Sequence, residues 1–269
     1  MLFHAKNGTL SLEKGTMDYI RSGTGERILL MLPGLGDSLR SVKGAAVPMA
    51  VMYREFARKF TVYSFSRIDP MPTGCTIRDM AHDLAQAMEV LDIQRADVFG
   101  VSMGGMIAQW LALDHPEKVA RLILAVTCPE PNPVLLEALE EWVALAKSGD
   151  HGAFLKSNMR RIYSEDYCRK NLWLAPIVGL LTKPKCYERF FIQAQACREH
   201  DALAQLPCIR ARTLVIGGER DKALGGEASK TIAAAIDGAE LKMNPQWGHG
   251  LYEEAKDFNG VLLEFLARA

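Results

Sequence analysis

The sequence lacks an excess of charge of either sign. Lys plus Arg and Asp plus Glu number 32 each, so the 269-residue chain is formally neutral at pH 7. Proteins that bind nucleic acid or an anionic membrane through long-range electrostatics carry a basic excess, so neither partner is expected. No apolar run reaches the roughly 18 residues of a transmembrane helix, and residues 1–8 lack the apolar stretch of a secretory signal. We therefore expect a cytoplasmic protein.

Cysteine is scarce and is not arranged in ligand or disulfide patterns. The six cysteines form no Cys-x-x-Cys pair and no zinc spacing. We interpret them as reduced side chains that mostly fill space, with disulfides as the alternative. No metal and no cofactor is expected. The cysteines are Cys75, Cys128, Cys168, Cys186, Cys197 and Cys208.

What the sequence does contain is an alternation of strands and helices. Residues 76–91 have helical spacing with Thr76 as a plausible N-cap, and residues 252–266 form a closing helix. Apolar runs of strand length precede and separate these helices. This alternation predicts the α/β class, with a mostly parallel, doubly wound sheet covered by helices on both faces. The expected strands are 9–13, 16–21, 27–32, 61–65, 96–101, 119–126, 213–216 and 241–243.

One connection is too long for this scheme. Between Thr127 and Thr213 lie 85 residues, whereas a crossover between parallel strands needs only about a dozen. The excess begins with a proline cluster at residues 129–133 and then has helical patterns at 134–147, 153–163, 173–181 and 187–199. We predict an all-helical cap at residues 129–207, inserted into a core of residues 1–128 and 208–269. The cap carries ten acidic and ten basic residues, which favours an uncharged or amphipathic ligand beneath it; an accessory bundle without a binding role is the alternative.

The most informative motif is Val-Phe-Gly-Val-Ser-Met-Gly-Gly at residues 98–105. An apolar run ends there and a helical pattern begins at once, as in a Gly-x-Ser-x-Gly nucleophile elbow, a strained strand-to-helix turn that exposes a serine hydroxyl. A Cβ atom at Gly100 or Gly104 would collide with the elements that cross beside the turn. The motif predicts that Ser102 is a nucleophile.

A serine nucleophile needs a histidine to take its proton and a carboxylate to orient that histidine. His249 lies between two glycines, after the last strand and before the closing helix, and we predict that it is the base. Asp221 follows the strand at 213–216 and is preferred over Glu219, because it lies further into the loop and has fewer free torsions. The other histidines are expected to be structural or at the surface: His4, His82, His115, His151 and His200.

An oxyanion intermediate needs two backbone donors. The N–H of Met103 opens the helix after the elbow, with the positive end of the helix dipole behind it. The glycine-rich stretch 32–38 follows the strand at 27–32 and supplies the N–H of Leu35 as the second candidate. Such a loop could instead bind phosphate, but it lacks the Lys-Ser/Thr of a P-loop and the third glycine of a dinucleotide fingerprint.

Taken in order, these motifs resemble the α/β-hydrolase fold superfamily, in the serine-nucleophile branch with a helical cap. The likeness extends over nearly the whole chain, and the order Ser102, Asp221, His249 is that of the family's triad. The resemblance implies serine hydrolase chemistry without a cofactor, most often on carboxylic esters. The resemblance does not identify the substrate.

Two departures from the family pattern concern the loops around the site. Pro33-Gly34 stands where many relatives have His-Gly, which should stiffen the oxyanion loop without removing its backbone donor. Residues 66–74 stand where many relatives have Asp-x-Arg-Gly-x-Gly, and they keep the arginine, Arg67, without the glycines.

The sequence therefore predicts nucleophilic acyl transfer on small to medium esters or lactones, with a small molecule as the only expected partner and no prediction of oligomeric state. Cap aromatics could contact the substrate, although such residues more often form the core of a cap. Carbon–carbon, amide or peptide cleavage and peracid formation are alternatives with the same triad, and a binding protein with negligible turnover is another. The candidate substrate contacts are Trp142, Trp173, Phe190 and Phe191.

Overall fold

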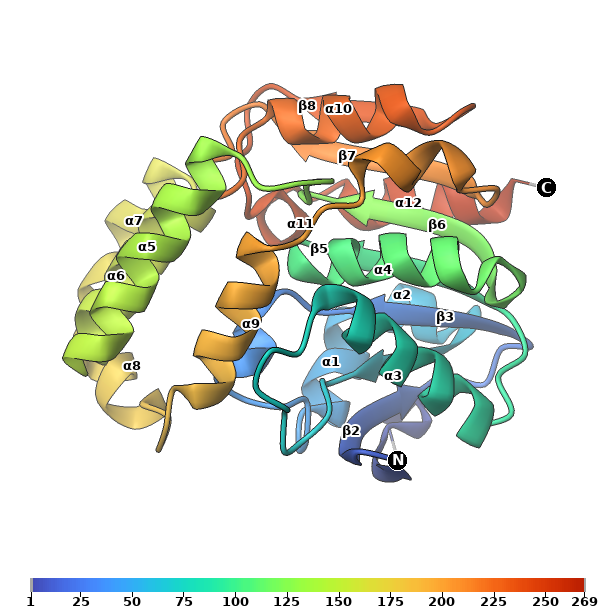
Figure 1. The fold of residues 1–269 in the computed structure, drawn as a ribbon, viewed down its shortest axis with the longest axis horizontal. Helices are drawn as coiled ribbons and strands as arrows, with labels where there is room; N and C mark the ends of the chain where they lie inside the picture. The colour runs from blue at the N-terminus through green and yellow to red at the C-terminus, as the bar shows by residue number, and fades with distance from the viewer. Residues whose placement is uncertain (1, 269) are drawn as a thin grey trace.

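The computed structural model describes residues 2–268, and its centre is an eight-stranded sheet in the order β1-β2-β4-β3-β5-β6-β7-β8 (Figure 1). The pairs β1–β2 and β2–β4 are antiparallel, and every later pair is parallel. The predicted α/β class with a mostly parallel sheet is confirmed. The strands are β1 (Lys6–Leu12), β2 (Gly15–Ser22), β3 (Arg27–Leu32), β4 (Phe60–Phe65), β5 (Ala96–Val101), β6 (Val119–Ala125), β7 (Arg212–Gly218) and β8 (Glu240–Asn244).

Two hydrophobic layers lie on opposite faces of the sheet, because successive strand side chains alternate between faces. Leu30 and Leu32 of β3 pack with α3 (Ile77–Val90), α4 (Met103–Asp114) and α10 (Glu227–Ala235). Leu29 and Met31 pack on the other side, with α2 (Arg54–Ala57) and α12 (Phe258–Ala267). The central strands are therefore buried on both faces, which explains their continuous apolar sequences.

Local sequence signals predicted the ends of most of the expected helices correctly. Thr76 caps α3 in a capping box with Asp79, as its position before the apolar pattern predicts. The single closing helix expected at 252–266 is instead two helices, α11 (Leu251–Glu254) and α12. Ala255 between them is extended, at φ −80° and ψ 114°. This change of direction lets both Leu251 and Phe258 reach the same buried layer.

The connection between β6 and β7, which the structure describes throughout, contains helices and no strand. It lies at one side of the sheet (Figure 1). We call residues 129–207 the insertion; its division from the core as a separate domain remains a prediction. Helix α9 runs back toward the sheet, while α5 to α8 form an outer group. The α-helices of the insertion are α5 (Pro133–Ser148), α6 (His151–Ile162), α7 (Glu165–Asn171), α8 (Ala175–Thr182) and α9 (Glu188–Arg198).

Some elements do not appear in the sequence-based scheme. Helix α7 has no buried residue and therefore no apolar stripe to reveal it. Helices α1 (Ala46–Met52), α2 and α10 were also not expected. All six cysteines are free thiols, and Cys75, Cys128 and Cys197 are buried. Within residues 2–268, no helix combines the length and apolarity needed to span a membrane.

Candidate active site

Ser102 occupies a strained turn between β5 and α4. Its φ of 55° and ψ of −124° fall in a region that non-glycine residues rarely adopt. The turn is held by bonds to the next strand: the N–H of Ser102 donates to the Ala125 carbonyl at 3.0 Å, and Thr127 Oγ1 donates to the Ser102 carbonyl at 2.7 Å. The side chain thus projects from the junction that the motif predicts.

The glycines of the motif are required by close backbone contacts. A Cβ atom on Gly100 would lie 2.7 Å from Cα of Gly105. One on Gly104 would overlap the carbonyl oxygen of Leu32 and lie 2.8 Å from that of Pro33. The elbow therefore fits against the end of β3 only because these positions carry no side chain.

His249 and Asp221 form a buried hydrogen-bonded pair, with 2.8 Å between His249 Nδ1 and Asp221 Oδ2. The other carboxylate oxygen accepts the N–H groups of Ala223 and Leu224, each at 2.8 Å. Burial opposes ionisation of Asp221, but the charge and hydrogen bond of His249 and these two N–H groups together hold the pKa of Asp221 below its ordinary value. An ionised carboxylate holds the proton on Nδ1 and leaves Nε2 of the imidazole free of it. The roles of His249 as base and of Asp221 as its orienting group remain predictions.

The loops that carry this pair are packed against each other at the carboxyl ends of β7 and β8. The N–H of Arg220 donates to the Trp247 carbonyl at 3.1 Å, and a Cβ on Gly218 would lie 2.5 Å from the carbonyl oxygens of both Trp247 and Gly248. Glu219, the carboxylate that was not preferred, lies 3.7 Å from Lys230 Nζ. The geometry therefore pairs the histidine with Asp221.

The two candidate oxyanion donors stand at the first residues of helical turns. Leu35 begins the 3-10 turn η2 (Leu35–Ser38), and Met103 begins α4. The first N–H groups of a helix have no acceptor within it, so both are free to point at a ligand. A Cβ on Gly34 would lie 3.1 Å from Cβ and 3.6 Å from Oγ of Ser102, so the loop before Leu35 lies directly against the serine. Their role as oxyanion donors remains a prediction.

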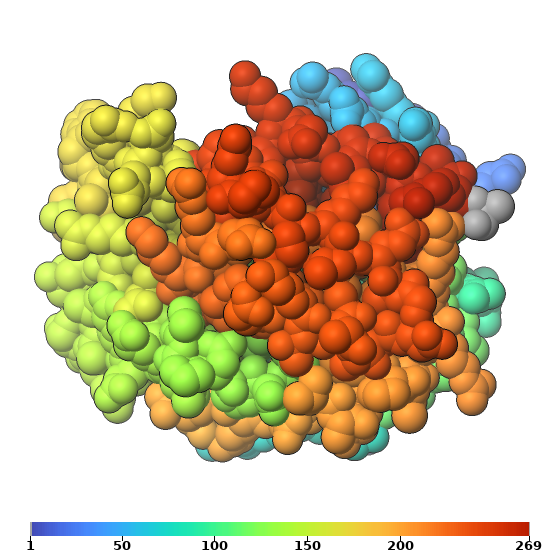
Figure 2. Space-filling model, turned by 90° about the horizontal axis from the view of Figure 1, so that it is seen from above, coloured from blue at the N-terminus to red at the C-terminus, as the bar shows by residue number. Residues whose placement is uncertain are grey.

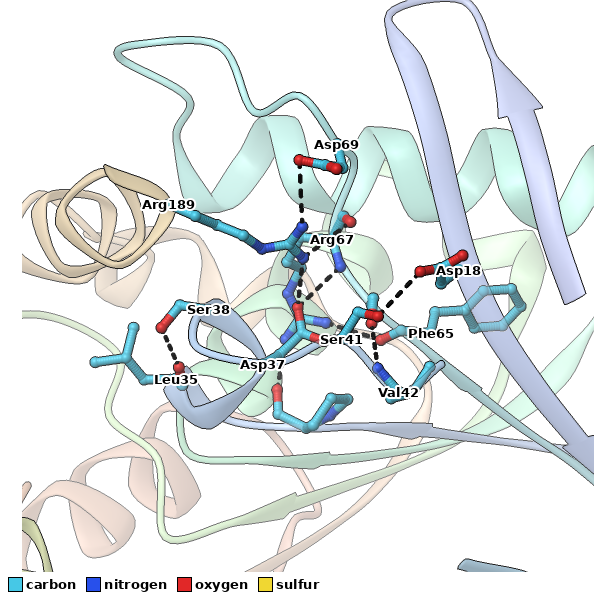
Figure 3. A network of polar contacts seen from close by, with 12 residues as sticks. Asp18, Leu35, Asp37, Ser38, Ser41, Val42, Phe65, Arg67, Asp69 and Arg189 are labelled. Atoms are coloured by element: carbon cyan, nitrogen blue, oxygen red, sulfur yellow. Dashed lines mark hydrogen bonds and ion pairs between the residues drawn. The ribbon is translucent and has the colours of Figure 1, made fainter. Parts of the chain in front are cut away.

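A buried polar network braces this loop (Figure 3). The Asp37 side chain has no exposed surface and accepts the backbone N–H of Arg67 at 3.0 Å. The Arg67 guanidinium, also buried, donates to the carbonyls of Pro33 and Phe65. Arg67, the arginine of the family pattern, thus joins the loop after β3 to the end of β4.

The insertion joins the same network through α9. Arg189 Nη2 donates to Asp37 Oδ2 at 2.8 Å and to the Arg67 carbonyl at 3.0 Å, and Arg189 Nη1 lies 3.9 Å from Asp69 Oδ1 (Figure 3). Sequence analysis did not identify Asp37 or Arg189. Asp37 lies in a glycine-rich loop whose composition points to backbone donors and not to its carboxylate, and nothing in the sequence around Arg189 distinguishes it from a surface arginine.

The four aromatic residues proposed as substrate contacts lie in different environments. Phe190 is 1 % exposed and makes an edge contact with Phe154, so it belongs to the core of the insertion. Trp142 is 6 % exposed, and its indole nitrogen has no hydrogen-bond partner among residues 2–268. Trp173 is 66 % exposed and donates to the Lys170 carbonyl. Phe191 is partly buried and lines a cavity of about 510 Å³.

This placement gives Phe190 a packing role and puts Trp173 on an outer surface. Contact of these four residues with a substrate remains a prediction.

Two other histidines, His151 and His200, make hydrogen bonds to side chains within the fold. His151 Nδ1 lies 2.7 Å from the Tyr187 hydroxyl, and His200 Nδ1 accepts from Trp110 Nε1 at 3.3 Å. Burial lowers the pKa of His200 to about 4, so it stays neutral. Within residues 2–268, His, Cys, Asp and Glu side chains form no group of three that could hold a metal.

Comparison with known proteins agrees with this architecture. A family profile described as the alpha/beta hydrolase fold matches residues 28–148, which include the oxyanion loop and the elbow. The crystal structure of MGS-M2, an alpha/beta hydrolase enzyme from a Medee basin deep-sea metagenome library, is 21 % identical with a TM-score of 0.85 and covers 97 % of this chain and 98 % of its own. The enol-lactonase from Burkholderia xenovorans LB400 is 20 % identical with a TM-score of 0.80, over 97 % and 100 %. This chain has the alpha/beta hydrolase fold.

Sequence relatives carry a more specific name. The protein named "Putative carbamate hydrolase RutD" in Variovorax paradoxus (strain S110) is 28 % identical over 206 residues, covering 74 % of this chain and 76 % of the relative. The protein of the same name in Caulobacter vibrioides (strain NA1000 / CB15N) is 22 % identical over 254 residues, covering 91 % and 92 %. The likeness therefore includes the insertion as well as the sheet.

Proposed function

We propose that this protein is a serine hydrolase that cleaves small to medium carboxylic esters or lactones by nucleophilic acyl transfer. The observation that carries the proposal is the buried Asp221–His249 hydrogen bond at the same edge of the sheet as the strained elbow at Ser102. A buried aspartate bonded to Nδ1 of a histidine is the arrangement that prepares an imidazole to accept a proton from a serine.

In the proposed reaction, Ser102 Oγ attacks the substrate carbonyl while Nε2 of His249 takes the hydroxyl proton. Asp221 stabilises the imidazolium, and the N–H groups of Leu35 and Met103 bind the negative oxygen of the tetrahedral intermediate. His249 then gives the proton to the departing alcohol oxygen. A water molecule that loses its proton to His249 attacks the acyl-serine, and collapse of the second intermediate releases the acid and restores Ser102.

The insertion is proposed to act as a lid that selects the substrate. It connects β6 to β7, and the carboxyl ends of these two strands flank the elbow and the Asp221 loop. Its balanced charge favours neutral acyl groups over phosphorylated ones. Structural neighbours whose titles name an enol-lactonase and esterases are consistent with an ester or lactone bond.

Carbamates are the second candidate substrates, because the sequence relatives in several bacteria carry the name of a carbamate hydrolase. A carbamate presents a carbonyl to the same nucleophile, but its nitrogen reduces the electrophilicity of that carbon. It would therefore acylate Ser102 more slowly than an ester unless the pocket supplies extra hydrogen bonds.

The test is labelling with a fluorophosphonate probe, followed by a substrate panel. The probe should add one equivalent to wild-type protein, on the peptide that contains Ser102, and none to Ser102→Ala. A panel of esters, lactones, carbamates, amides and a carbon–carbon hydrolase substrate, with a peracid assay, then identifies the bond. Folded protein that does not label would contradict the serine hydrolase proposal, and labelling without turnover would indicate a binding protein.

A further inference from the structure

A second cavity lies behind the catalytic loops. This groove, of about 1460 Å³, separates α7 of the insertion from α11 and from the loops at residues 219–222 and 246–248. Figure 2 shows the yellow surface of the insertion beside the red surface of the C-terminal region that borders it. Neither Ser102 nor His249 lines the groove. It is therefore separate from the candidate active site, although Asp221 forms part of its wall.

The wall of the groove is rich in aromatic rings. Tyr163 and Tyr167 stack with their ring centres 4.2 Å apart, and Tyr252 of α11 also lines the groove. Tyr53 and Trp247 complete the aromatic part of the lining. Ring faces carry negative electrostatic potential and attract cations, so a wall of this kind suits a positively charged organic group.

One carboxylate stands among these rings without a cationic partner. Glu253 Oε2 accepts the Tyr163 hydroxyl at 2.7 Å, and no Lys, Arg or His among residues 2–268 forms an ion pair with it. Its neighbour Glu254 is used differently, since it accepts the N–H of Ser164 at 2.9 Å and joins α11 to the start of α7. Basic side chains also line the groove, at Lys170, Arg220, Lys222 and Lys256, and among them Lys222 lies 3.9 Å from Glu165.

The charge of Glu253 acts on all four tyrosines. Burial raises the pKa of Tyr53 to about 12, and Glu253 contributes in the same direction. The same two causes raise the pKa of Tyr163, Tyr167 and Tyr252. The phenols therefore stay neutral at physiological pH, and Glu253 is the negative charge that acts on all four of them.

We propose that this groove binds an organic cation, a primary or quaternary ammonium group, with Glu253 as the counter-charge and the tyrosine rings as the walls. A divalent metal is a poor fit, because it prefers several oxygen ligands, and no three His, Cys, Asp or Glu side chains among the described residues are grouped so that they could hold a metal. The binding does not depend on whether Ser102 reacts.

The experiment uses choline as the cation and 3,3-dimethylbutan-1-ol as its neutral isostere, in calorimetric titrations of the full-length protein. Choline should bind at one site and the isostere at least about tenfold more weakly, because only the cation gains from the carboxylate and the ring faces. Glu253→Gln should weaken choline binding by at least about tenfold. Glu26→Gln, which removes an exposed carboxylate at the start of β3, should not change it.

Two further variants keep the test decisive. Tyr163→Phe retains the ring but loses the hydroxyl that orients Glu253, so it should weaken choline binding even if Glu253→Gln does not fold. Ser102→Ala should bind choline like the wild type, so failure of the hydrolase proposal would not affect the result. Absence of saturable choline binding to folded protein, equal binding of the isostere, or unchanged binding by Glu253→Gln would overturn the proposal.

Discussion

The guanidinium of Arg189 on α9 lies 2.8 Å from the carboxylate of Asp37, in the loop that carries the candidate oxyanion donor Leu35. The Asp37 side chain is completely buried, and its charge is therefore compensated only within the protein. One end of this ion pair belongs to the insertion and the other to the catalytic core. The position of α9 and the shape of the loop that carries Leu35 are thus linked through this ion pair.

Replacing Arg189 should damage both stability and catalysis. Arg189→Ala leaves the carboxylate of Asp37 with one partner fewer, which should lower the free energy of unfolding by about 2 kcal/mol. It should also lower kcat, because the oxyanion loop loses a support. Urea unfolding and ester hydrolysis measure the two effects. Arg198→Ala, at an exposed position on the same helix, is the control; an equal loss in both variants would show that the contact has no special role.

The Asp221–His249 pair should dominate the pH dependence of hydrolysis. Activity needs a neutral imidazole, so kcat/KM should rise from acid to neutral pH. His249→Ala and Asp221→Asn should each reduce kcat by about 10³ to 10⁴. If His249→Ala kept most of the activity while His151→Ala or His200→Ala lost it, the base would be misassigned.

The Asp221–His249 pair should also stabilise the fold, except at low pH, where Asp221 becomes protonated. The pKa of Asp221 is depressed in the folded protein, so the ionised form is favoured there more than in the unfolded chain. This contribution is complete above the ordinary pKa of 3.8 and is lost as pH falls through the lower folded value. The difference in unfolding free energy between wild type and Asp221→Asn should therefore shrink below about pH 4. A difference that grew in this range would contradict the assignment.

Two glycines in helices should respond oppositely to alanine. In α4, Gly104→Ala would force a methyl group into the carbonyls of Leu32 and Pro33, and we expect a loss of more than about 2 kcal/mol. In α12, a Cβ on Gly260 meets no atom within 4 Å. Gly260→Ala should therefore raise stability by about 0.5 to 1 kcal/mol, because alanine favours the helix. Thermal melts of the two variants measure both changes; equal shifts would show that the elbow tolerates a side chain.

The features that sequence analysis predicted correctly depend on local patterns. The buried strands, the cap at Thr76 and the elbow at Ser102 are each encoded within a few consecutive residues. The contact of Arg189 with Asp37 joins positions 152 residues apart and has no local signature. Helix α7 escaped prediction because none of its residues is buried. Long-range polar contacts and exposed helices could therefore be identified only from the structure, because neither leaves a periodic apolar pattern in the sequence.

The insertion should set the preferred length of the acyl chain. If the substrate lies beneath it, each added methylene that is buried contributes up to about 0.8 kcal/mol, which is about fourfold in kcat/KM. Efficiency on p-nitrophenyl esters should then climb with chain length until the space is filled. Phe191, partly buried beside a cavity of about 510 Å³, is the side chain to shorten, and Phe191→Ala should move the optimum to longer chains. Leu180→Ala, which removes a mostly exposed side chain of α8, should leave the optimum in place. A chain-length profile that no substitution in α5 to α9 alters would mean that the insertion does not contact the acyl group.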